Sequence, residues 1–261
     1  MSLNPIEWLK KGWVYASRRR SKNHTCTIQT ALKILGSSKV VTAETSRALW
    51  NIENLPELGD LLVPYPRALL SEIDKLNVSR WNGARVDFRL VYRTGMAPYT
   101  FRDIVREQKC TSVYRAGGLL EGKDTWMYQS SPSGYILANM RPQFLNTRPS
   151  KQDEVLAQFP FPSKRICAPD LIEMLLSLRA EKKEFHLKKF FCGTDTMLIP
   201  ADSSALARIL VGMYDQRGML ILPAHENHMD EDTGIISIII PQVPDIRNDM
   251  RQAQNAPPTA G

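Results

Sequence analysis

The chain has 261 residues, 43% of them hydrophobic and 23% charged, which is typical of a globular protein that can bury its own core. Its apolar runs are far shorter than the roughly 20 residues that cross a bilayer, and Lys10 and Lys11 interrupt any signal-like N-terminal stretch. The four cysteines are scattered without a CxxC pair, which argues against a zinc ribbon or a disulfide framework. We therefore expect a protein of the cytoplasm or nucleus with reduced thiols, neither secreted nor transmembrane.

The excess of positive over negative charge is confined to one end of the sequence. The net charge is +7, and residues 1–40 alone account for all of it, since residues 41–261 carry equal numbers of acidic and basic side chains. A basic segment ahead of an electrically neutral body attracts an anionic partner, either nucleic acid or anionic lipid.

Residues 1–22 form an amphipathic basic segment in which Trp8 and Trp13 interleave with cationic side chains. The tryptophans suit a membrane interface, and they equally suit stacking on bases. A third interpretation is a first helix whose tryptophans pack on the body. The candidate anion-binding residues of this segment are Lys10, Lys11, Arg18, Arg19, Arg20 and Lys22.

The first half of the chain begins with helical patterns and then changes to period two. Alternation over Arg85–Arg93 predicts the clearest strand, and a capping-box-like Thr100–Asp103 opens a helix to about Lys109. We predict helices over 27–35, 42–50 and 65–76, a turn over 79–83, and shorter strands over 111–115, 125–129 and 134–140.

Prolines mark residues 141–168 as a long connection, either functional or a boundary between lobes. Beyond it we predict helices over 169–182 and 203–216, strands over 185–191, 196–200, 219–222 and 235–240, and a disordered tail over 248–261. Helices come first and strands later, which favours an α+β fold. We expect a basic arm with a short helix (1–40) and a single domain (41–247), in which a mostly antiparallel sheet packs against two or three helices.

Motifs for catalysis are weak, and we predict no catalytic residues, no cofactor and no metal. Phosphate-binding loops and GxSxG are missing from the sequence. His225 and His228 stand among acidic residues, but a solvated hairpin loop explains that stretch as well as a metal site does. A nuclease of the paired-carboxylate kind would use Asp195 and Asp202, with residues 181–183 nearby.

An arginine face is the better candidate site. Arg85, Arg89 and Arg93 recur at period two on one side of the predicted strand. Arg102 and Arg106 lie on the outer side of the following helix. Together they would form a cationic surface for phosphate, unless they lie on a solvated edge or pair with neighbouring acids such as Asp87, Asp103 and Glu107.

The order of these features resembles the matrix proteins of rhabdoviruses. The similarity covers the basic start and roughly residues 80–145: the strand 85–93, the turn at Pro98, the helix 100–109, and the segments 113–117 and 133–141. Such proteins have no enzymatic activity, and the resemblance implies a structural virion protein that bridges an anionic membrane and ribonucleoprotein, associates with itself and takes part in budding.

The resemblance also draws attention to short proline motifs. Tyr65, Pro66 and Leu69 look like a YPxxL late-domain signal for host budding factors, although they fall in a predicted helix, and Pro257–Gly261 only approaches a PTAP motif. Two alternatives remain open. One is a nucleic-acid-binding or metal-dependent nucleic-acid-processing protein, and the other is a regulatory protein that uses its basic segment as a nuclear address.

Overall fold

The computed structural model describes residues 25–50, 52, 62–81, 83–100, 113–115, 125–184, 186–198, 205–215, 218–225, 228 and 230–241. Its α-helices are α2 (Ile28–Leu35), α3 (Ala43–Leu49), α4 (Arg67–Val78), α6 (Thr125–Tyr128), α7 (Pro149–Leu156) and α8 (Ala168–Lys182), with a 3-10 turn η1 (Ser37–Lys39). The basic segment 1–22, the predicted helix 100–109 and the tail 248–261 lie outside the described ranges.

Five strands form the first sheet in the order β2 (Val40–Val41), β6 (Phe88–Arg93), β8 (Gly134–Asn139), β14 (Ser237–Ile239) and β9 (Ser163–Arg165). Only the β2–β6 pair is parallel. The β6–β8 ladder runs from Phe88 opposite Asn139 to Arg93 opposite Gly134, and it forms the centre of this sheet.

The second sheet has the order β13 (Thr233–Gly234), β10 (Phe191–Leu198), β11 (Ala207–Asp215), β12 (Gly218–His225) and β7 (Val113–Arg115). Its three central strands are antiparallel, and its two edge pairs are parallel. Two further antiparallel pairs are β1 (Cys26–Thr27) with β3 (Leu62–Val63), and β4 (Arg80–Trp81) with β5 (Ala84–Arg85).

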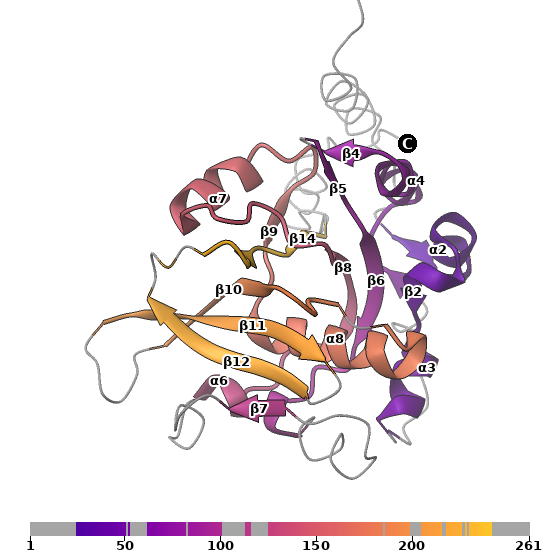
Figure 1. Ribbon diagram of the computed structural model, residues 1–261. Coiled ribbons are helices and arrows are strands. Elements are labelled where there is room, and N and C mark those ends of the chain that lie inside the picture. Colours follow the sequence, from indigo (N-terminus) through magenta and orange to yellow (C-terminus); the bar gives the residue numbers. More distant parts are fainter. Residues whose placement is uncertain are drawn as a thin grey trace, which may run out of the picture.

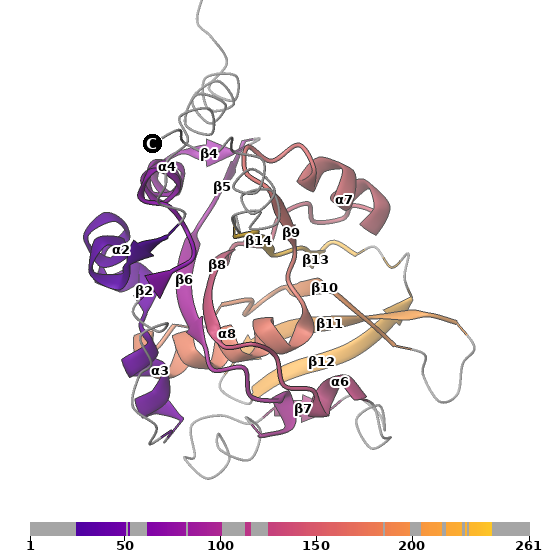
Figure 2. The same ribbon diagram turned by 180° about the vertical axis from the view of Figure 1, so that it is seen from behind.

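The first sheet is covered on both faces, and this decides where its side chains lie. Phe88, Leu90 and Tyr92 pack with α2 and α4 in one hydrophobic cluster. Val91 packs on the opposite face, in a second cluster with α8 and the second sheet. Figures 1 and 2 show α2 and α4 beside β6, and α8 contacts β6 as well as β10 and β11 of the second sheet.

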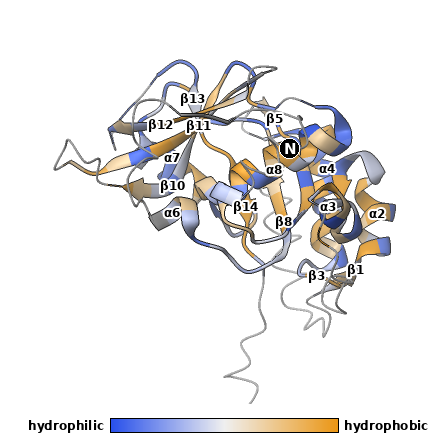
Figure 3. Ribbon diagram, turned by 90° about the horizontal axis from the view of Figure 1, so that it is seen from below, coloured by the Kyte–Doolittle hydropathy of each residue, from blue (hydrophilic) through white to orange (hydrophobic). Residues whose placement is uncertain are grey.

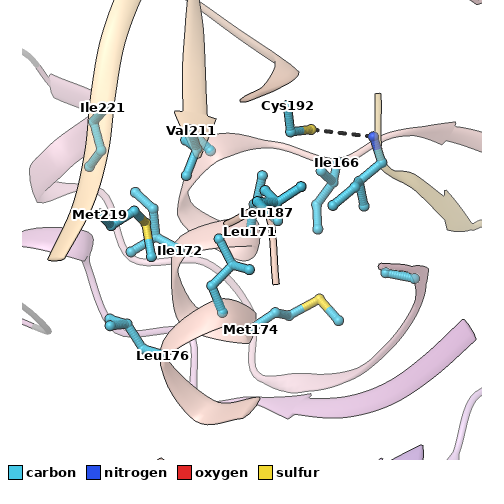
Figure 4. Packing of buried hydrophobic residues seen from close by; sticks show 14 of the residues in the cluster. Ile166, Leu171, Ile172, Met174, Leu176, Leu187, Cys192, Val211, Met219 and Ile221 are labelled. Atoms are coloured by element: carbon cyan, nitrogen blue, oxygen red, sulfur yellow. Dashed lines mark hydrogen bonds between the residues drawn. The ribbon is translucent and has the colours of Figure 1, made fainter. Parts of the chain in front are cut away.

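Helix α8 lies at the centre of the second cluster, and each of residues 170–178 is buried. In Figure 4, Ile172 and Leu176 of this helix lie near Met219 of β12, and the Cys192 sulfur of β10 accepts a hydrogen bond of 3.3 Å from the amide of Ile236. The hydrophobic residues of α8 and β8 lie toward the middle of the molecule in Figure 3. The α+β class, with mostly antiparallel sheets and helices packed on them, is thus confirmed.

Several predicted elements are present at their expected places. The helices at 28–35, 43–49, 67–78 and 168–182 and the strand over 134–139 agree closely with the sequence patterns. Local capping explains two of the helix starts, since the hydroxyls of Thr27 and Thr42 accept hydrogen bonds from the amides of Thr30 and Thr45.

Other elements differ from the prediction. The predicted helix 203–216 is wrong, because residues 207–215 form the strand β11. Its Ala207, Ile209 and Val211 alternate into the core, and pairing with both β10 and β12 outweighs the helical spacing. The predicted strand 125–129 is the one-turn helix α6, and the strands 185–191 and 196–200 are one strand, 191–198. The connection 141–168 contains α7 and β9.

None of the helices in the described ranges is both long and apolar enough to cross a membrane.

Candidate anion-binding surface

Arg89 lies inside a chain of ion pairs rather than on a free surface. Its side chain is 9% exposed and contacts the carboxylates of Asp87 at 3.0 Å and Glu184 at 3.0 Å. Asp87 also pairs with Lys39, and Glu184 with His186 at 3.0 Å. Burial by itself raises the pKa of Asp87, but the hydrogen bonds from Arg89 and Lys39 hold that pKa below its ordinary value.

Arg93 is also occupied within the fold. Its guanidinium pairs with the carboxylate of Asp170 in the first turn of α8, and the two side chains are only 16% and 7% exposed. The interpretation of Arg85, Arg89 and Arg93 as one phosphate-binding face therefore fails for Arg89 and Arg93. The alternative, pairing with a neighbouring acid such as Asp87, holds for Arg89. Period two does place Arg89 and Arg93 on one side of the strand, but α8 and the segment after it cover that side.

Arg85 is the member of the set that stays at the surface. It belongs to β5, which pairs with β4 in a tight hairpin, and Gly83 next to β5 has a positive φ of 77°, as such turns require. The hairpin is anchored by Trp81, which is 3% exposed and packs edge-on against Phe159 with ring centroids 4.6 Å apart.

Two further arginines lie beside Arg85. Arg80 stands directly opposite it in the β4–β5 ladder, and both side chains are exposed. Arg141 is exposed as well, and the side-chain amide of Gln143 donates to the carbonyls of both Arg85 (3.2 Å) and Arg141 (3.3 Å), so the two backbones are neighbours. We call Arg80, Arg85 and Arg141 the hairpin arginines.

The hairpin arginines form an uncompensated cationic group. Within the described part of the chain, none of the three takes part in an ion pair. Like charges directly opposite each other on a ladder are unfavourable in isolation, and an anion between them removes that cost. The Asn-Gly turn signal could have placed Arg80 opposite Arg85 from the sequence, whereas the position of Arg141 depends on the tertiary contact through Gln143.

The late-domain-like residues lie in the core. Tyr65 and Leu69 are 1% and 6% exposed, and Pro66 precedes the first turn of α4. The Tyr65 hydroxyl donates to the carbonyl of Ile239 and accepts from the amide of Leu137, both at 3.1 Å. The interpretation of this segment as an exposed signal for host budding factors does not fit this burial, because the tyrosine is a structural bridge between β8 and β14.

Replacing Tyr65 with phenylalanine is expected to lower the free energy of unfolding by about 1–3 kcal/mol, because the Leu137 amide and the Ile239 carbonyl each lose their bridge. Urea unfolding measures this loss. Tyr128 is 52% exposed, and the matched substitution Tyr128→Phe should change stability by less than about 0.5 kcal/mol. Equal stability of the two variants would contradict the bridging role.

The remaining sequence candidates do not assemble into a site in the described residues. Lys10, Lys11, Arg18, Arg19, Arg20, Lys22, Arg102, Arg106, Trp8, Trp13 and Asp202 lie outside those ranges. Asp195 lies within β10, and His225 ends β12, where its carbonyl accepts a hydrogen bond of 2.8 Å from the amide of His228. Within the same ranges no three His, Cys, Asp or Glu side chains come together as a metal site.

Two cysteines and one histidine are candidates for nucleophilic chemistry. Burial raises the pKa of Cys167 and of Cys192 to about 12, which disfavours the reactive thiolate at neutral pH. Burial also lowers the pKa of His186, whose ring contacts Glu184 rather than a thiol or hydroxyl. Cys192 is buried, and Cys167 and His186 are half-buried.

Comparison of the chain with protein-family models, with curated proteins and with solved structures found no match.

Proposed function

We propose that this chain is a non-enzymatic, matrix-like assembly protein that bridges an anionic membrane and ribonucleoprotein and associates with itself in an intracellular virus assembly. The observation that carries the proposal is the charge distribution: residues 1–40 hold the whole excess of +7, and residues 41–261 are neutral. Such segregation concentrates the attraction for polyanions in one segment.

The described part of the chain supports this division of roles. Arg89 and Arg93 of β6 form ion pairs with carboxylates inside the fold, so they stabilise the body rather than bind a partner. The hairpin arginines are exposed and form no ion pair with another described residue, and they add a second cationic surface to the basic segment. The two together suit contacts with phosphate groups, for which the forked guanidinium is well shaped.

The test is binding of the full chain to a fluorescent 20-nucleotide RNA and to vesicles with or without phosphatidylserine, at 50 and 200 mM salt. We expect binding to both anionic partners that weakens steeply with salt, because each contact with phosphate releases a counterion. Deleting residues 1–22 should weaken binding at least ~10-fold and flatten the salt dependence.

A second pair of variants tests whether the hairpin arginines contribute more to binding than the same number of positive charges elsewhere on the surface. Arg80, Arg85 and Arg141 are changed together to glutamine, and the matched control changes the exposed residues Arg67, Arg148 and Lys188. The hairpin variant should lose several-fold more affinity than the control, although both lose three positive charges. Unchanged affinity after the deletion, or binding to neutral vesicles as strong as to anionic ones, would refute the proposed function.

A further inference from the structure

A pocket of about 400 Å³ lies where the two sheets meet, at a place that the proposed function does not use. Its lining comes from α7, from β9 of the first sheet and from β10 and β11 of the second. The Asp195 amide donates to the Ile166 carbonyl at 3.0 Å, which joins β10 to the segment after β9 beside the pocket. Pockets of this size accommodate small organic ligands.

The charges around the pocket are not balanced. Three cations, Lys164, Arg165 and Arg208, line it together with two acids, Asp153 and Asp195. Arg165 and Asp153 neutralise each other, because the Nε of Arg165 contacts the Asp153 carboxylate at 2.8 Å. Among the residues that line the pocket, Asp195 is then the acid that remains for Lys164 and Arg208, so one positive charge of this lining is left over.

Arg208 has spare hydrogen-bonding capacity at this place. Its Nη1 donates to the carbonyl of Thr194, while its Nε is enclosed and has no acceptor. Burial and the neighbouring Arg165 lower the pKa of Arg208, while Asp153 and Asp195 act in the opposite direction, so these acids offset only part of the cost of its charge. A bound oxyanion would supply both acceptors and negative charge to this cationic lining.

We propose that this pocket binds the phosphate group of a small phosphate ester, held by Arg208 and Lys164. A guanidinium and an ammonium that approach from two strands suit a tetrahedral oxyanion, which offers acceptors in several directions. Leu156 and Ala157 of the pocket wall provide an apolar surface for the organic part of the ester. Arg165 acts as a positioning residue, because nearly all of its donors bond to the protein.

Isothermal titration of the full chain with inorganic phosphate, adenosine monophosphate and inositol trisphosphate tests this site. We expect saturable binding of one ester molecule per chain, tighter than that of inorganic phosphate. The preferred ester tells a nucleotide from a lipid headgroup. Arg208→Gln should weaken ester binding at least tenfold and Lys164→Gln several-fold, whereas Arg67→Gln, an equal loss of charge at an exposed position of α4, should leave it unchanged.

Asp195→Asn supplies a readout of opposite sign. It removes the acid that competes with the ligand, so phosphate affinity should increase several-fold, whereas a site for cations would weaken. A decrease with Asp195→Asn, or equal affinity of Arg208→Gln and Arg67→Gln, would overturn the proposal. Since Lys164 and Asp195 are exposed, their variants give the answer even where Arg208→Gln fails to fold. Neutralising the hairpin arginines leaves this binding intact, so the two proposals fail independently.

Discussion

Replacing Arg165 with methionine is expected to lower the free energy of unfolding by roughly 3–5 kcal/mol. The arginine side chain is 4% exposed, and besides Asp153 it bonds to the Gln152 side chain at 2.9 Å and to the carbonyls of Pro149 (2.9 Å) and Gly193 (3.2 Å). These last three acceptors lose their donor in the variant. Asp153 is 55% exposed and can return to water, so its charge adds little to the cost.

The loss of stability in the Arg165 variant should be accompanied by local detachment of α7. Three of the four partners of Arg165 belong to α7, so this one guanidinium holds α7 against β9 and β10. Urea unfolding measures the global effect, and amide hydrogen exchange over residues 149–156 measures local detachment of the helix. Arg148→Met, at an exposed position, is the matched control and should cost less than about 0.5 kcal/mol. A loss below 1 kcal/mol with unchanged exchange in α7 would show that Arg165 is not the anchor.

The second large effect is a dependence of stability on pH that comes from Glu173. This residue of α8 is 1% exposed, and its carboxylate accepts a 2.7 Å hydrogen bond from the Thr94 hydroxyl and further ones from the amides of Thr94 and Gly95. Burial raises the pKa of Glu173 to about 7, against the lowering influence of these donors and of Arg93.

The folded chain therefore binds this proton more tightly than the unfolded chain does. Its contribution to stability is complete below the ordinary carboxyl pKa of about 4.5 and is lost as the pH rises through about 7. We expect stability to fall by roughly 3 kcal/mol between pH 5 and pH 8. Urea unfolding at steps of half a pH unit measures this decrease.

The variant Glu173→Gln tests whether the pH dependence of stability comes from Glu173. Glutamine keeps a carbonyl oxygen for the donors of Thr94 and carries no charge, so it resembles the protonated carboxyl. The variant should match the parent near pH 5 and exceed it by roughly 3 kcal/mol at pH 8. Because the pKa of His186 is lowered, this histidine makes stability rise with pH near pH 6.5, opposite to the effect of Glu173. Parent and variant share this contribution, so it cancels when their stabilities are subtracted. Parallel stability curves for parent and variant would exclude Glu173 as the source.

The contrast between β6 and β11 shows how far the sequence could predict the fold. Strong local signals gave elements of the correct type. The alternation over 85–93 predicted a strand, which the structure divides into β5 and β6, and the apolar pattern over 169–182 predicted α8. Leu206, just before β11, and Ile209, Leu210 and Met213 within it have helical spacing, yet β11 pairs with strands on both sides. Gly212 permits this pairing, because a side-chain carbon there would lie 2.1 Å from the Phe190 carbonyl oxygen.

By itself, the sequence determined the features that depend on composition and on near neighbours in the chain. These are the excess of positive charge in residues 1–40, the α+β class and most of the helix positions. Only the tertiary structure decided which polar groups are free. Arg85 and Arg89 stand four residues apart on one strand pattern, but Arg89 is buried between Asp87 and Glu184 of a distant segment, while Arg85 extends from a hairpin into solvent. Burial and ion pairing depend on residues far apart in the chain, and a local pattern carries no information about them.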